Sequence, residues 1–253
     1  MHRGSNVKVI PARKAARERA MGGGGENMDL RQLADYLQRD LREVSKLASR
    51  GNVPGRKVGG EWRFARAEIN LWIEQQMHAY TEQQLTALES PDDAEQAVVS
   101  SLLSEATIAV PLPATTRSSV LRELVKLAEQ SWSVYDPEAL LFAVQQREQL
   151  GSTALASGVA IPHPRRAVPA ILGESVVAYG RTISGIPFGA NDGSLTDVYF
   201  LVCCRDDRTH LRVLARLSRL MLQPGFLEAL RAADTPEDTW QTIRAAELEL
   251  LPD

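Results

Sequence analysis

Residues 197–204 read DVYFLVCC, and residues 174–181 read ESVVAYGR. Each contains an apolar run without an interrupting polar residue, which is typical of a strand that is buried on both faces. GVAIPH at 158–163 has the pattern of a third, shorter strand that ends in a loop. Helical patterns surround these runs at SSVLRELVKLAEQ (118–130), PEALLFAVQQREQL (137–150) and THLRVLARLSRLML (209–222). Because helices and strands alternate, we predict an α/β domain over residues 102–250, with helices on both faces of one mixed sheet.

Composition excludes several other classes of protein. The 253 residues are 44% hydrophobic and 24% charged, which does not fit a mostly disordered chain, a fibrous repeat or a disulfide scaffold. We expect no membrane insertion, because no apolar run reaches about 18 residues, and we expect a cytoplasmic protein, because the basic start lacks the apolar core of a secretory signal. Cys203 and Cys204 are adjacent in an apolar run, which favours packed thiols over a disulfide or a metal site.

Charge divides the chain into two parts. Residues 1–78 contain 15 Lys and Arg against nine Asp and Glu, whereas residues 79–253 contain 14 against 23. This asymmetry indicates two modules with different partners, of which the basic one suits nucleic acid. Residues 1–27 have the composition of a disordered basic arm followed by a glycine linker, and Met21 and Met28 are further candidates for the start of the chain. Residues 79–101 are polar and are predicted to form a connector that is partly helical.

Residues 28–78 predict a small unit with three helices and a hairpin. Asp40 can cap the second helix, which stops at Gly51. Gly59 and Gly60 suit a tight hairpin turn, in which both residues need a positive φ. The segment ARAEINLWIEQQM then predicts a closing amphipathic helix with its apolar residues on one face.

The stretch from Leu30 to Ile73 resembles the excisionase-like, MerR-related winged helix-turn-helix family, and VGGEWRF (58–64) is its most specific mark. The resemblance implies binding to DNA. The basic residues expected to contact DNA lie on one face of the second helix and beside the hairpin: Arg42, Lys46, Arg50, Arg56, Lys57 and Arg63. The alternative is a module for protein contacts whose charged face is only solvated. For Trp62 we favour a packing role in the hairpin over stacking on a base.

His163 lies between two prolines, directly after an apolar run. The prolines stiffen the loop and fix the direction of the imidazole, which can act as a nucleophile because its ordinary pKa is close to 7. Two further residues draw attention in this half of the chain: Arg147 in REQLGST and His210 in THLRVLARLS. Alone, Arg147 would suit a surface ion pair and His210 a capping or interface position.

These three stretches together resemble the IIA domains of the fructose–mannitol type in the phosphoenolpyruvate-dependent phosphotransferase system, including the nitrogen-regulatory branch, over about residues 103–248. The resemblance implies that His163 accepts a phosphoryl group from the histidine phosphocarrier protein. It implies that His210 is the second active-site histidine and that Arg147 is the loop arginine. The phosphoryl transfer that it implies needs no cofactor or metal. The implied acceptor is a IIB protein or a regulatory target. The loop sequence HPRR is closer to the sugar-type domains, which leaves the branch open.

The chemistry of phosphoryl transfer fits these residue types. Arg147 is permanently cationic and can fork onto phosphate oxygens. His210 is expected at the start of a helix capped by Thr209, where backbone N–H groups favour an anion. Gly151, Ser152 and Thr153 are expected to form a turn that positions Arg147.

Two functions therefore stand at this point, a IIA-type phosphotransferase and a DNA-binding regulator whose IIA-like domain senses phosphorylation. A third interpretation treats both modules as protein-interaction platforms without phosphoryl transfer.

Overall fold

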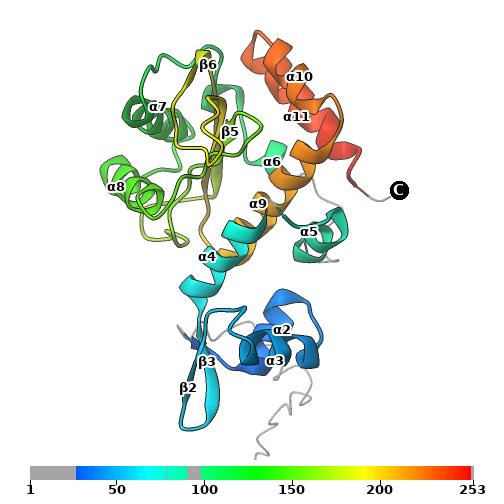
Figure 1. Cartoon of the computed structure of the whole chain (residues 1–253). Coiled ribbons are helices and arrows are strands. Elements are labelled where there is room, and N and C mark those ends of the chain that lie inside the picture. Colours follow the sequence, from blue (N-terminus) through cyan, green and yellow to red (C-terminus); the bar gives the residue numbers. More distant parts are fainter. Residues whose placement is uncertain (1–26, 78, 90–97, 252–253) are drawn as a thin grey trace, which may run out of the picture. The chain divides into compact units, whose positions relative to one another are not determined.

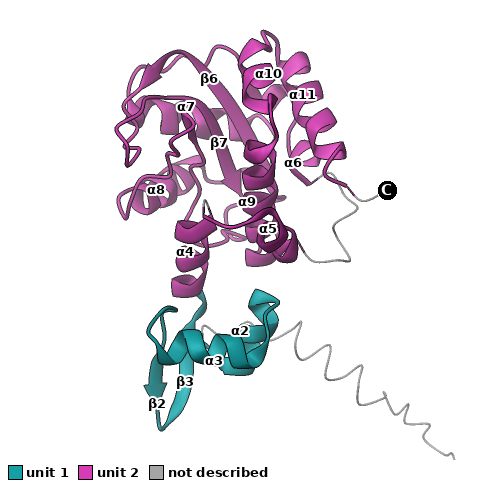
Figure 2. Ribbon diagram, turned by 45° about the vertical axis from the view of Figure 1, so that its right-hand side comes forward, with its two compact units in different colours: residues 1–66 teal, residues 67–253 magenta. Residues whose placement is uncertain are grey.

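A computed structural model describes residues 27–77, 79–89 and 98–251 of the chain. The predicted basic arm therefore lies outside the described residues, except for Asn27. The chain divides into two compact units, residues 1–66 and residues 67–253, which are described separately (Figure 2). In the stretches that the structure describes, no helix has both the length and the apolar character needed to cross a bilayer.

The first unit contains two helices and a three-stranded antiparallel sheet. Its strands follow the order β1-β3-β2. The elements are β1 (Asn27–Met28), α2 (Leu30–Leu37), α3 (Leu41–Ser49), β2 (Arg56–Val58) and β3 (Glu61–Ala65).

Local sequence explains where these elements begin and end. Asp40 caps α3 through a hydrogen bond from the backbone N–H of Arg42, and Gly51 takes a φ of 72° beyond the end of this helix. Gly59 and Gly60 have φ values of 61° and 86°, as a two-residue turn between twisted strands requires. The predicted cap, helix stop and hairpin are all confirmed.

The second unit begins within α4 (Arg66–Met77), which continues directly from β3. The remaining elements are α5 (Glu82–Leu88), α6 (Val98–Ser101), η2 (Glu105–Thr107), β4 (Ile108–Ala109), α7 (Arg117–Glu129), α8 (Pro137–Glu148), β5 (Val159–Ala160), β6 (Val176–Ile186), β7 (Thr196–Cys203), α9 (Asp207–Leu222), α10 (Phe226–Ala232) and α11 (Pro236–Leu248).

The sheet of the second unit is mixed and has the order β4-β6-β7-β5. Its central pair, β6 and β7, is antiparallel, and each edge strand pairs in parallel with its neighbour. Helices α7 and α8 cover one face of the sheet and α9 to α11 the other (Figure 1). Because successive side chains alternate between the faces, Leu201 and Cys203 pack in the core on the α7 and α8 side, while Phe200 and Val202 are equally buried on the opposite face. The predicted α/β architecture is confirmed, as are the packed thiols, since both cysteines are free and buried.

A buried ion-pair network attaches the predicted connector to this domain. Glu89, at the C-cap of α5, accepts hydrogen bonds of 2.9 and 2.7 Å from Arg216 and one of 2.8 Å from Arg219, both on α9. Glu247 of α11 lies 3.3 Å from Arg216 and accepts from the backbone N–H groups of Val99 and Ser100. Glu89 of the connector thus serves an internal contact, which sequence composition alone does not show.

Candidate functional site

His163 stands in the loop after β5, with only 4% of its surface exposed. Its Nδ1 lies 2.7 Å from the backbone oxygen of Ile161. A carbonyl oxygen can only accept a hydrogen bond, so Nδ1 carries the proton. Nε2 faces the carboxylate of Glu74 and the guanidinium of Arg147, and it is the ring nitrogen that acts as the nucleophile when it carries no proton.

Arg147 approaches the same nitrogen. It lies in the last turn of α8 and not in the loop, with its Nε 3.2 Å from Nε2 of His163. One of its terminal nitrogens donates to the backbone oxygen of Gly151 at 3.0 Å, so the predicted role of this turn is confirmed for Gly151. Glu148, buried beside it, accepts from the backbone N–H and the hydroxyl of Thr153 at 3.0 and 2.8 Å. These bonds fold REQLGST back on the helix and set the position of the guanidinium.

His210 lies in the first turn of α9 and is 2% exposed. Its ring centre is 5.0 Å from that of His163. The expected Thr209 cap is wrong: Asp206 caps the helix and accepts from the backbone N–H of Thr209 at 2.8 Å. The helix begins earlier because the carboxylate of Asp206 reaches the N3 position, which Thr209 occupies. Burial lowers the pKa of His210, and the hydrogen bond that His210 donates to Glu74 opposes this effect only in part.

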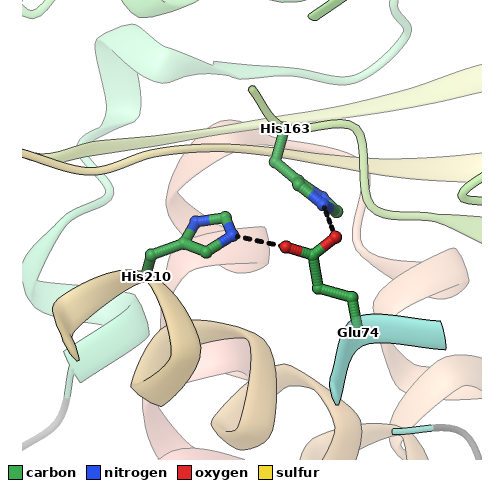
Figure 3. A group of neighbouring side chains, drawn as sticks. All are labelled: Glu74, His163 and His210. Carbon is green, nitrogen blue, oxygen red and sulfur yellow. Dashed lines mark hydrogen bonds and ion pairs between the residues drawn. The ribbon is translucent and has the colours of Figure 1, made fainter. Parts of the chain in front are cut away.

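Glu74 of α4 completes the cluster, and sequence reasoning missed it. Its side chain is 3% exposed, and Oε2 lies 3.0 Å from Nε2 of His163 and 3.2 Å from Nε of Arg147. Its other oxygen lies 3.3 Å from Nε2 of His210 (Figure 3). Burial raises the pKa of Glu74, but the charge and hydrogen bonds of the two histidines outweigh burial and hold it well below its usual range.

Two imidazoles and one carboxylate also form a possible metal donor set. The candidate ligand atoms of Glu74, His163 and His210 all lie within 4.8 Å of one another. Arg147, however, is hydrogen-bonded to the same oxygen and the same nitrogen. A permanently positive guanidinium at this position disfavours a divalent cation and favours an anion. The site is therefore built to hold negative charge next to Nε2 of His163.

The basic residues of the first unit occupy the predicted elements with two differences. Arg42 and Lys46 are exposed on α3, and Arg56 and Lys57 are exposed on β2. Arg50 forms the C-cap of α3 and so lies at the edge of the expected helix face.

Arg63 differs in its partner. It is half-buried and donates to Glu61 at 2.7 Å. Trp62 stacks on the buried ring of Phe64 at 5.7 Å, which fits its predicted packing role, and Lys57 lies 5.2 Å from its centre.

The fold and the site together define a helix-turn-helix unit followed by an α/β domain with a histidine pair at one sheet edge. The family model described as "Phosphoenolpyruvate-dependent sugar phosphotransferase system, EIIA 2" matches residues 101–246. This match covers more than half of the chain, and the chain belongs to this family. A second model, described as "Helix-turn-helix domain", matches residues 28–77, which include α4.

Curated relatives come from both branches of this family. A fructose-specific EIIA component of Haloferax volcanii is 29% identical, over 56% of this chain and 91% of the relative. A nitrogen regulatory protein of Bradyrhizobium diazoefficiens is 31% identical, over 53% of this chain and 87% of the relative. A fructose-specific EIIABC component of Bacillus subtilis is 26% identical over 55% of this chain, which spans only 22% of that longer protein.

A solved structure supports the same fold. The nitrogen regulatory protein IIA-Ntr of Neisseria meningitidis superimposes with a TM-score of 0.53 and 25% identity, covering 58% of this chain and 99% of that one. The similarity thus concerns the α/β domain, to which this chain adds the helix-turn-helix.

Proposed function

We propose that the chain is a phosphohistidine carrier that accepts a phosphoryl group on Nε2 of His163 from the histidine phosphocarrier protein. The observation that carries this proposal is the bond from Nδ1–H to the oxygen of Ile161, which leaves Nε2 as the nucleophile. Arg147 and His210 lie close enough to bind the phosphoryl oxygens as negative charge develops on them.

Phosphoryl transfer to His163 requires no accompanying proton transfer. The lone pair of Nε2 forms the new P–N bond in line with the donor nitrogen, which keeps the electron pair of the bond that breaks. The proton on Nδ1 of His163 stays on that nitrogen, in its hydrogen bond to the backbone oxygen of Ile161. The phosphoryl group then passes to a IIB protein, acts on a regulatory target or is lost to water. Relatives named for fructose and for nitrogen regulation support both branches, and a regulatory role suits a chain that also carries a helix-turn-helix.

The test is the intact mass of the full chain after incubation with phosphoenolpyruvate, enzyme I and the histidine phosphocarrier protein. Samples stay at neutral or alkaline pH, because phosphohistidine is labile in acid. We expect one added phosphoryl group on the wild type and none on His163→Ala. His210→Gln is the matched control, because it alters the other buried histidine of the site without removing the nucleophile, and it should gain the group more slowly. Added mass on His163→Ala would contradict the assignment of the acceptor.

A second function, DNA binding through residues 28–78, is supported by the helix-turn-helix match and by the exposed basic residues on α3 and β2. Replacement of Lys46 and Arg50 by glutamate should abolish retardation of a pool of random-sequence duplexes. The matched control replaces Arg122 and Lys126, which have the same spacing on the exposed side of α7. Unchanged retardation in the Lys46 and Arg50 variant would reject this binding face.

A further inference from the structure

The structure assigns to Glu74 a role that the family match does not contain: its carboxylate fills the phosphoryl position of His163 as an internal anion. Helix α4 is then an autoinhibitory latch, and phosphorylation of His163 releases it. We call Glu74 with the helix that carries it the α4 latch. This inference rests on the proposed carrier function of His163.

The first argument is that Glu74 binds the groups a phosphoryl would need. Its Oε2 is 3.0 Å from the nucleophilic Nε2 of His163 and 3.2 Å from Nε of Arg147, and its Oε1 is 3.3 Å from His210. All three side chains of the anion site are therefore occupied by one carboxylate, and Figure 3 shows its contacts with the two histidines. A phosphorus atom bonded to Nε2 would displace Oε2, so the carboxylate and the phosphoryl group exclude each other.

The second argument is access. The side chains of Glu74, His163 and His210 are each exposed by no more than 4%. A donor phosphohistidine must approach Nε2 in line, within bonding reach, which a buried nitrogen with a carboxylate against it does not permit. The arrangement in the structure is therefore the resting state, and phosphoryl transfer requires that Glu74 leave.

The third argument is charge. Glu74 is ionised in its present position, and a phosphoryl group adds about two negative charges at neutral pH. Like charges at hydrogen-bond distance in a buried site repel each other strongly. Phosphorylation of His163 thus removes both the binding site of the carboxylate and its electrostatic stabilisation, which favours a displaced α4 until the phosphoryl group has gone.

The fourth argument is the path of the chain. Glu89 anchors α5 to α9 through Arg216 and Arg219, and α9 also carries His210. Only a short segment separates α4 from this anchored helix, so Glu74 stays close to the site at a high effective concentration even when it is displaced. At its other end, α4 follows β3 without a break and belongs to the helix-turn-helix match at 28–77. The phosphorylation state of His163 is therefore linked to the last helix of that module.

A positioning role for Glu74 is the competing explanation, in which the carboxylate orients His163 for catalysis. The two roles predict opposite changes in the rate of phosphoryl transfer when Glu74 is replaced. Loss of a positioning carboxylate slows phosphoryl transfer, whereas loss of the latch accelerates it. The experiment measures the initial rate of phosphorylation of the full chain by the histidine phosphocarrier protein and, separately, by phosphoramidate, a small donor that needs no protein docking. Glu74→Ala and Glu74→Gln are compared with Glu68→Ala, which removes an exposed acidic side chain from the same helix.

We expect both Glu74 variants to be phosphorylated at least tenfold faster than wild type with either donor, and Glu68→Ala to match wild type. Equal or slower rates in the Glu74 variants would overturn the latch while leaving the carrier function intact. If no variant acquires a phosphoryl group from either donor or from the nitrogen-branch phosphocarrier protein, the carrier function fails and the latch fails with it.

Hydrogen exchange supplies a readout that does not depend on the rate. In the phosphorylated wild type, backbone amides of α4 should exchange faster than in the unmodified protein, whereas those of α7 should not change. Phosphorylation without any loss of protection in α4 would also overturn the latch.

Discussion

Glu74 and Glu89 come from consecutive helices, and each enters a buried cluster of basic side chains in the second unit. Glu89 accepts three hydrogen bonds of 2.7 to 2.9 Å from two arginines. Glu74 has longer contacts of 3.0 to 3.3 Å, and two of its three partners are histidines. Arginine keeps its charge at every pH at which the protein folds, whereas the charge and bonding of histidine can change.

The difference shows that buried carboxylates can hold the neighbouring helices α4 and α5 in two ways, one reversible and one permanent. The contact of Glu89 with α9 has no component that chemistry at neutral pH can remove, so it serves as a permanent anchor. The contact of Glu74 depends on a nitrogen that we propose to be phosphorylated, so it is reversible. The following experiments test this contrast, beginning with the largest expected effect.

Replacement of Glu89 by alanine should cause the largest loss of stability. It leaves Arg216, whose side chain is fully buried, and Arg219 without their shared carboxylate, and a broken buried pair costs about 3–5 kcal/mol. The measurement is the urea midpoint of the full chain. The control is Glu82→Ala, whose exposed carboxylate lies 3.6 Å from Arg219 and should contribute less than about 1 kcal/mol. Similar losses in both variants would remove the distinction between anchor and surface pair.

Replacement of Glu74 by alanine should destabilise the chain less, by about 1–3 kcal/mol, because two of its three partners are histidines, which can be buried in the neutral form. A loss as large as that of Glu89→Ala, measured in the same urea series, would show that the α4 contact is not the weaker of the two.

Stability should fall in two stages as the pH is lowered. The pKa of His210 is lowered by burial below its ordinary 6.5, so its neutral form contributes stability that is complete above pH 6.5 and is lost as the pH falls below it. The pKa of Glu74 lies below its ordinary 4.5, so its contribution is complete above pH 4.5 and is lost under more acidic conditions.

Urea midpoints between pH 8 and pH 2 would check this order. His210→Asn should remove the first stage and keep the second. The titratable groups that act on His210 are Glu74, His163 and Asp207, and all three remain in this variant. An unchanged pH profile in His210→Asn would assign the first stage to another group.

Sequence predicted the parts of this site that are fixed locally. The pattern around His163 and the REQLGST stretch each depend on neighbours within a few residues, so periodicity and turn chemistry reveal them. The α/β fold was equally visible in its apolar runs. The Thr209 cap was wrong because two aspartates and a threonine compete for one helix start. The contacts of Glu74 were not visible in the sequence. Glu74 is separated from His163 by 89 positions and from His210 by 136, and a polar contact at such separation leaves no periodic signal.

The smallest effect distinguishes the reach of Glu74 from its charge. Glu74→Asp keeps the negative charge but shortens the side chain by one methylene, so the carboxylate can no longer span contacts to His163, Arg147 and His210 together. We expect phosphorylation by phosphoramidate a few-fold faster than in the wild type and slower than in Glu74→Ala. A rate equal to the wild type would mean that a nearby negative charge suffices to block the site. A rate equal to that of Glu74→Ala would mean that the block depends on the geometry of the three contacts. Glu74 would then resemble Glu89, whose contacts with its two arginines also depend on the position of the carboxylate.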